Sequence, residues 1–208
     1  MTTTDAGDLK KRQWRATLTA LGMLPVLILL AIGFQLLSGR FLSFSNLSIV
    51  MQQASINIVL AAGMTFVVLT GGIDLSVGSI LAASAMVGLI VSLIPDMGML
   101  GIPAAIAVGL ICGLLNGAVI AYMKLPPFIV TLGSLTAIRG FARLLGNDST
   151  IFNSSLPFAF IGNGSIFGAP ALAIIALATV VVSWFILKRT VLGTRIYAVG
   201  GNEEAARL

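Results

Sequence analysis

Residues 71–79, with the sequence GGIDLSVGS, lie between two long apolar segments and decide how this part of the chain can fold. Asp74 is the only carboxylate between Asp8 and Asp96. Two consecutive glycines can interrupt a helix, and Asp74 or Ser76 can cap the following helix by accepting hydrogen bonds from free backbone N–H groups. The stretch therefore predicts an interrupted helix whose carboxylate faces a polar cavity, caps a helix or pairs with a partner.

Two interpretations of residues 71–79 are open from the sequence. Broken helices at membrane depth occur where the freed backbone lines protein or water, so the stretch can belong to a transport path. Alternatively, Asp74 merely caps a helix at an interfacial turn. The candidates for a translocation path or a structural motif are Gly71, Gly72, Asp74, Ser76, Gly78, Ser79 and Asn116.

The composition predicts an integral membrane protein. The chain is 58% hydrophobic and 9% charged, with a mean hydropathy of +1.07, whereas a soluble domain carries roughly 25% charged residues. It has no histidine and a single cysteine, Cys112, which argues against zinc sites, disulfides and thiol or imidazole catalysis. We expect no catalytic residue, metal or cofactor. The net charge of +5 comes from basic residues at the ends of apolar segments, so we expect no nucleic-acid partner.

Six apolar segments are long enough to cross ~30 Å of hydrocarbon, and they predict an all-α polytopic transmembrane helix bundle. They cover about 17–37, 48–69, 76–95, 102–123, 127–145 and 169–187. The polar stretch 147–168, rich in turn formers and phenylalanine, is expected to be a compact loop that meets a partner or packs over the span ends.

The basic residues predict the orientation in the membrane. With the N-terminus inside, Arg40 is the only basic residue of the outer segments, and nine of the twelve basic residues lie in inner segments. These nine are Lys10, Lys11, Arg12, Arg15, Lys124, Lys188, Arg189, Arg195 and Arg207. The positive-inside rule then places a tail of residues 1–16 in the cytoplasm, a transmembrane domain at 17–187 with an outer loop at 147–168, and a cytoplasmic segment at 188–208.

Two arginines, Arg139 and Arg143, lie inside the fifth apolar segment, four residues apart and hence on one helix face. Arg143 can reach the outer interface with its long side chain. Arg139 is deeper and should face protein or water. It either bonds to carbonyl groups of a neighbouring helix, the interpretation we favour, or contacts a substrate directly.

The fourth apolar segment carries a stripe of small residues at every fourth position, Ala105, Gly109, Gly113, Gly117 and Ala121. Such a stripe allows another backbone to approach closely, so Gly109, Gly113 and Gly117 are predicted to pack against a helix of the same subunit. Asn116 flanks the stripe and can bond across helices or reach a polar ligand, and we expect the former.

The C-terminal residues predict a short capped helix. Asn202 is a candidate N-cap, Glu203 and Glu204 complement the helix dipole in the first turn, and the residues after them continue the helix. The residues assigned to this element are Asn202, Glu203, Glu204, Ala205, Ala206 and Arg207. Because the helix ends without a closing glycine or a polar tail, we expect the chain to be incomplete.

Three motifs together carry a resemblance to a known family. They are residues 71–79, residues 127–133 (PFIVTLG) and residues 200–208 (GGNEEAARL). From about Phe41 to Leu208 the chain resembles the permease subunits of bacterial ribose-type monosaccharide ABC importers. The resemblance implies about six of the roughly ten membrane spans of that family. It also implies that residues 202–207 begin the cytoplasmic EAA-type loop, whose short helix docks into the ATPase subunit.

The resemblance further implies an assembly in the bacterial inner membrane. Its members are two permease copies, two ATPase domains that hydrolyse ATP on a separate chain, and a periplasmic sugar-binding protein. The permease itself has no chemistry, and neutral sugars need donors, acceptors and apolar walls along their path.

Two other functions compete with the importer. An ion-coupled secondary transporter would use Asp74 to bind a proton or cation, and a non-transporting scaffold would use only the small-residue stripe. The capped helix at residues 202–207 favours the importer, because neither rival requires a docking element there.

Overall fold

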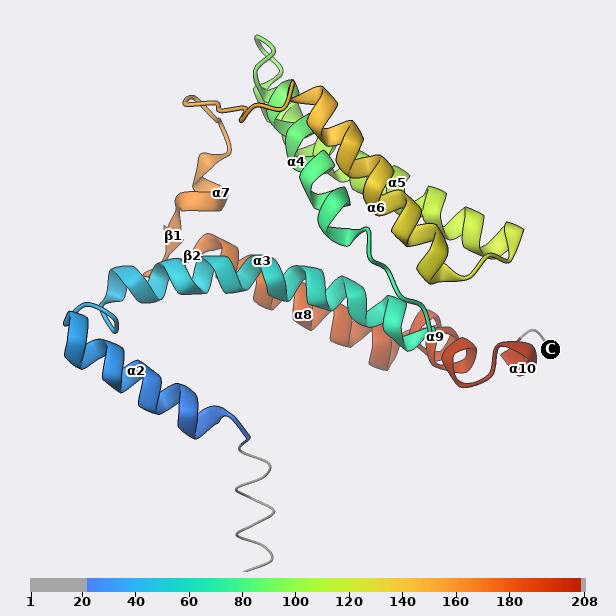
Figure 1. The fold of residues 1–208 in the computed structure, drawn as a ribbon, viewed down its shortest axis with the longest axis horizontal. Helices are drawn as coiled ribbons and strands as arrows, with labels where there is room; N and C mark the ends of the chain where they lie inside the picture. The colour runs from blue at the N-terminus through green and yellow to red at the C-terminus, as the bar shows by residue number, and fades with distance from the viewer. Residues whose placement is uncertain (1–21, 207–208) are drawn as a thin grey trace, which may run out of the picture. The chain divides into compact units, whose positions relative to one another are not determined.

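The computed structural model describes residues 22–206 (Figure 1). The predicted tail 1–16, the beginning of the first apolar segment and Arg207 of the predicted coupling element lie outside the described residues.

The all-α fold class is confirmed. The helices are α2 Leu24–Ser38, α3 Phe44–Leu69, α4 Val77–Ser92, α5 Gly101–Met123, α6 Pro127–Leu145, α7 Ala159–Asn163, α8 Ala171–Arg189, α9 Val191–Gly201 and α10 Glu203–Ala206, with a 3-10 turn η1 at Gly98–Leu100 (Figure 1). Two short antiparallel strands, β1 Ser165–Ile166 and β2 Ala169–Pro170, accompany them.

Within residues 22–206, four helical segments are long and apolar enough to cross a membrane, namely Phe44–Leu69, Gly98–Met123, Pro127–Leu145 and Ala171–Arg189. The other two expected spans are occupied by shorter apolar helices, α2 with 15 residues and α4 with 16. Helix α4 is short because the chain between Leu69 and Val77 is not helical, so the interrupted region shortens the span that follows it. The protein is therefore a multi-pass membrane protein.

The chain divides into two compact units at Val50. In the first, α2 ends at Gly39, whose φ of +67° is left-handed and whose N–H donates to the carbonyl of Gln35 at 2.8 Å. The Gln35 side chain then accepts a bond from the N–H of Leu42 at 2.8 Å, which holds the turn into α3.

The second unit contains a cluster of α4, α5 and α6 (Figure 1). Ala83 of α4 is fully buried in it. Helices α4 and α5 are in close backbone contact at two glycines, because a Cβ added to Gly101 would lie 2.6 Å from the carbonyl oxygen of Gly88. Backbone contact of this kind is typical of membrane helices that meet through small residues.

The loop between α6 and α8 packs over the ends of α4 and α5, one of its two predicted roles. Asn153 donates to the carbonyl and hydroxyl oxygens of Ser92, at 3.1 and 3.0 Å. The ring of Phe158 lies against Gly101, and Pro157 lies against Gly98. The loop therefore fixes the same end of the cluster at which the two glycines meet.

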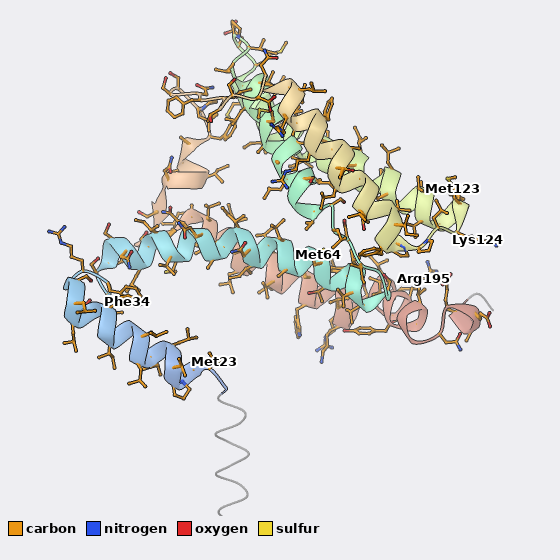
Figure 2. The ribbon with its side chains drawn as sticks, in the orientation of Figure 1. Met23, Phe34, Met64, Met123, Lys124 and Arg195 are labelled. Carbon is orange, nitrogen blue, oxygen red and sulfur yellow. The ribbon has the colours of Figure 1, made fainter. Side chains whose placement is uncertain are left out.

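The connections at the other end of the cluster are short. Helix α5 ends at Met123, Lys124 adopts a left-handed φ of +54°, and Pro127 begins α6 (Figure 2). Proline at the first position of a helix costs no hydrogen bond, so α6 can start directly after the turn.

Candidate functional site

The interruption between α3 and α4 begins with a glycine turn. The N–H of Gly72 donates to the carbonyl of Val67 at 3.0 Å, and the N–H of Gly71 donates to that of Val68 at 3.0 Å. These two bonds form a Schellman motif with Thr70 as the C-cap residue, and in this motif the residue after the C-cap must be left-handed. Gly71 has a φ of +78°, which explains why glycine occupies this position. The predicted helix break is therefore confirmed. Its first turn is held by hydrogen bonds between residues close together in the chain.

Asp74 stabilises the second half of the interruption by hydrogen bonds with Ser76. One carboxylate oxygen accepts hydrogen bonds from the N–H of Ser76 at 2.7 Å and from its hydroxyl at 2.6 Å. Asp74 thus binds the residue directly before α4, whereas the sequence predicted a bond from the first turn of that helix. Ser76 is the N-cap residue, but its side chain makes no capping bond. Its hydroxyl instead donates to Asp74 and accepts a bond from Asn116 in another helix.

A buried chain of hydrogen bonds runs from Asp74 across the helix cluster. The side-chain amide of Asn116 in α5 donates to the hydroxyl oxygen of Ser76 at 3.0 Å, and the hydroxyl of Ser134 in α6 donates to the amide oxygen of Asn116. Ser76 is 0% exposed and Asn116 8%. We call Asp74, Ser76, Asn116 and Ser134 the polar chain. Every donor in it points towards the carboxylate, an arrangement in which each bond polarises the next.

Two further hydrogen bonds attach α6 to the interruption and to α4. The hydroxyl of Thr131 donates to the carbonyl of Ile73 at 3.0 Å, and that of Ser79 donates to the carbonyl of Leu135 at 2.9 Å. Thr131 is 2% exposed. The same hydroxyl lies 2.8 Å from the carbonyl oxygen of Pro127 in α6, so its one proton is shared between that carbonyl and the carbonyl of Ile73, which the helix break removes from helical bonding.

The structure therefore sorts the predicted site residues into two groups. Ser76, Ser79 and Asn116 are buried and bonded, and the expectation that Asn116 bonds across helices is confirmed. Gly71 and Gly78 are exposed. Sequence reasoning missed the α6 hydroxyls of Thr131 and Ser134, although two hydroxyl residues three positions apart in an apolar helix are a signal for a polar face.

The arrangement suits mechanical support more than chemistry. Asp74 is engaged by two donors from Ser76, and the amide of Asn116 is used on both its nitrogen and its oxygen. Among residues 22–206 no cluster of three or more His, Cys, Asp or Glu side chains occurs that could hold a metal ion.

The small-residue stripe of α5 packs as predicted only at one end. A Cβ on Gly109 would lie 3.5 Å from the hydroxyl of Ser84, but a Cβ on Gly113 or Gly117 would meet no other atom within 4 Å among the described residues. Packing of Gly113 and Gly117 inside this chain is therefore not observed. The reason is geometric, because each four-residue step turns about 40° beyond a full helical turn, so a stripe of this spacing winds away from the neighbouring helix. The packed face passes through Asn116 instead.

The two arginines of α6 differ. The Nε of Arg143 lies 2.6 Å from a carboxylate oxygen of Asp148, with both side chains largely exposed. Arg139 is exposed and makes no hydrogen bond or ion pair within residues 22–206. The predicted bond from Arg139 to a carbonyl group of a neighbouring helix is therefore not found in the described part of the chain.

The predicted N-cap at the C-terminal end is confirmed. The side-chain oxygen of Asn202 accepts a hydrogen bond from the N–H of Ala205 at 3.0 Å, and Glu203 and Glu204 occupy the first turn of α10. Sequence reasoning missed α9, the helix that precedes this element (Figure 2 labels its residue Arg195). Its signal was Thr190, whose hydroxyl oxygen accepts the N–H of Gly193 at 3.3 Å.

Comparison with known proteins identifies the chain's relatives. Residues 46–208 match the family model described as branched-chain amino acid transport system / permease component. The ribose import permease protein RbsC of Haemophilus influenzae is 37% identical over 190 residues, which cover 89% of this chain and 58% of the relative. RbsC of Bacillus subtilis is 38% identical over 201 residues, which cover 95% and 62%. The fructose import permease protein FrcC of Rhizobium meliloti is 35% identical over 193 residues, which cover 88% and 53%.

No solved structure matches the chain. The chain spans about three fifths of the length of the ribose permeases that it matches. The resemblance to ribose-type permeases that the three motifs suggested is confirmed by these relatives. The match to the family model covers most of the chain, and the chain therefore belongs to the permease family of branched-chain amino acid transport systems.

Proposed function

We propose that this chain is the membrane-spanning permease part of an ATP-driven importer of a monosaccharide such as ribose. Its relatives include import permeases for ribose, allose and fructose, and the identity extends over most of the chain. The permease provides the translocation path and has no catalytic residue. ATP hydrolysis takes place on a partner chain.

The observation that carries this proposal is the engagement of Asp74 in the polar chain. A carboxylate that coupled transport to an ion gradient would have to gain and lose a proton or cation during each cycle. Asp74 instead holds two donors of Ser76, which is itself held by Asn116. A change of charge at Asp74 would weaken the two hydrogen bonds from Ser76, and through Ser76 it would disturb the bond to Asn116 in α5. The polar chain therefore favours a fixed structural carboxylate over the alternative of an ion-coupled secondary transporter.

The exposed side of the interruption is our candidate for the sugar path. Gly71, Ile73 and Gly78 are exposed there, whereas the polar side chains of residues 71–79 are turned into the helix cluster or bonded. A sugar is neutral and rich in hydroxyl groups, so free backbone groups and apolar surface at a helix break suit it better than a charge.

The proposed partners follow from the same assignment. They are a second permease copy, an ABC-type ATPase subunit, a periplasmic sugar-binding protein and the lipid of the bacterial inner membrane. The N-terminal tail 1–16 lies in the cytoplasm, residues 17–187 form the permease domain with an outer loop at 147–168, and residues 188–208 begin the coupling element. The exposed helix α10, with two carboxylates in its first turn, supports a docking role for residues 202–207.

The test is a pair of substitutions at Asp74, made in the permease assembled with its ATPase and binding protein in vesicles. Asp74→Asn keeps an oxygen that accepts the bonds of Ser76, so ATP-dependent ribose uptake should stay within about threefold of the parent. Asp74→Leu leaves Ser76 without an acceptor and should destabilise the protein by about 2–4 kcal/mol. Asp96→Asn is the matched control, because Asp96 is an exposed loop residue.

A secondary transporter would behave differently. Uptake that is driven by an ion gradient without ATP, and that is lost in Asp74→Asn, would contradict the importer.

A further inference from the structure

Helix α9 touches the end of α3 at Gly200. A Cβ added to Gly200 would overlap the backbone carbonyl oxygen of Leu69, and it would lie 3.0 Å from the carbonyl carbon of Leu69 and 3.5 Å from the Cα of Thr70. A Cβ added to the adjacent Gly201 would meet no atom within 4 Å among the described residues. The backbone of α9 therefore contacts the backbone of α3 at Gly200, whereas a side chain at the neighbouring Gly201 would point away from this contact.

The contact lies between the two functional elements of the chain. Leu69 is the last residue of α3, and the glycine turn that leads to Asp74 follows it directly. On the other side, Gly200 is two residues before Asn202, the cap of α10. The N–H of Asn202 also donates to the carbonyl of Ala198 at 3.0 Å, so α10 is bonded to the last turn of α9.

Helix α9 is itself well anchored. Thr190 caps it and also donates to the carbonyl of Ile186 in α8 at 2.7 Å, and Gly193 and Ile196 are buried. Because α9 is bonded to α10 at one end and to α8 at the other, we expect a displacement of α10 to move α9 together with the end of α8.

We infer that Gly200 is a positioning residue for transport, through which movement of α10 reaches the interruption and the polar chain. This inference rests on the proposed function, in which α10 docks on the ATPase. A contact between two backbones is stiff, because no side chain lies between them that could rotate to another rotamer and absorb the movement. Any side chain at Gly200 would separate the two helices and weaken the transmission.

The first experiment compares Gly200→Ala with Gly201→Ala in the assembled importer. It measures ribose uptake and ATP hydrolysis, and it takes the ratio of the two as the readout. Gly200→Ala should lower the sugar transported per ATP roughly tenfold while ATP hydrolysis continues, since a coupling free energy of 1–3 kcal/mol corresponds to a factor of about 5–150. Gly201→Ala should match the parent. Equal ratios in the two variants would overturn the inference.

The second experiment decides the matter even if Gly200→Ala fails to assemble. Cysteines replace Thr70 and Gly201, both exposed, in a Cys112→Ala background, and a short bismaleimide bridges them. If α9 and the end of α3 move together, the bridge forms and uptake equals that of the unbridged double variant. A bridge that abolishes uptake, or no bridging at all, would overturn the inference.

The outcomes also separate this inference from the proposed function. If the parent protein takes up ribose without ATP, the proposed function fails. If uptake by the parent requires ATP but the two alanine variants transport equally well, only the role of Gly200 fails.

Discussion

Two neighbouring faces of α5 have opposite environments, although the sequence marks both for contact. The face through Asn116 is buried and bonded to α4 and α6, whereas the face through Gly113 and Gly117 meets no other element among the described residues. An amide without a partner in an apolar surrounding costs free energy, so it must turn towards other polar groups. A glycine allows close contact but gains little from it, because lipid is as apolar as a helix. The need of buried polar groups for hydrogen-bond partners therefore determines which face of an apolar helix is packed. Small residues only permit packing.

The glycines that do pack fit the same interpretation. Gly88 and Gly101 lie at the end of the cluster that the loop covers, where Asn153 and Phe158 hold the chain in place. Their contact depends on neighbours that bring the helices together.

The comparison predicts the largest effect for Asn116→Leu. This change leaves the hydroxyls of Ser76 and Ser134 with fewer partners in a buried place, so it should lower the free energy of unfolding by about 3–5 kcal/mol. Unfolding of the purified protein in detergent by a graded denaturant measures it. Leu115→Ala is the control, because Leu115 is adjacent and 61% exposed. Equal stability of the two variants would show that the polar chain does not select the face.

A smaller effect is expected for Gly101→Ala. The added methyl group would lie 2.6 Å from the carbonyl oxygen of Gly88 and 3.1 Å from the ring of Phe158, so α4, α5 or the loop must shift. Overpacking of this kind costs about 1–3 kcal/mol. The same denaturation measurement applies, and a variant as stable as the parent would show that the helix contact is loose.

The smallest effect is expected for Gly113→Ala in the same assay. The methyl group meets open space, and alanine is favoured over glycine in a helix by about 0.5–1 kcal/mol, so stability should stay equal or rise slightly. A methyl group is large enough for this test, because it would already disturb a true backbone contact. Destabilisation by more than 1 kcal/mol, on the scale of ~1–3 kcal/mol for overpacking, would show that this face is covered after all.

Much of the fold could be predicted because it depends on local rules. The apolar segments located α3, α4, α5, α6 and α8, and the two glycines followed by Asp74 located the interruption. Pro127 and Asn202 marked helix starts that the structure contains. Helix α9 was missed because it is neither long nor strongly apolar. Its only signal in the sequence was Thr190, a residue type that commonly caps helices.

The candidate site could be predicted in part. Asp74, Ser76 and Asn116 were chosen correctly as polar groups that an apolar surrounding must accommodate, but their partners were not. Ser134 is 18 residues from Asn116 in the chain, and Asn116 is 40 residues from Ser76. Such pairs depend on how packed helices are rotated and how they cross. The spacing of residues along one helix gives no information on either.

The sequence by itself determined that the protein is helical, lies in a membrane, and has an interrupted helix and a capped C-terminal helix. These features follow from apolar content, glycine conformation and side-chain to backbone bonds between residues close in the chain. Only the tertiary structure decided that Asn116 joins three helices, that Gly113 stays uncovered and that Gly200 meets Leu69. The physical reason is that each of these contacts depends on which faces of two helices meet. The choice of faces depends on hydrogen bonding of polar groups and on side-chain packing throughout the protein.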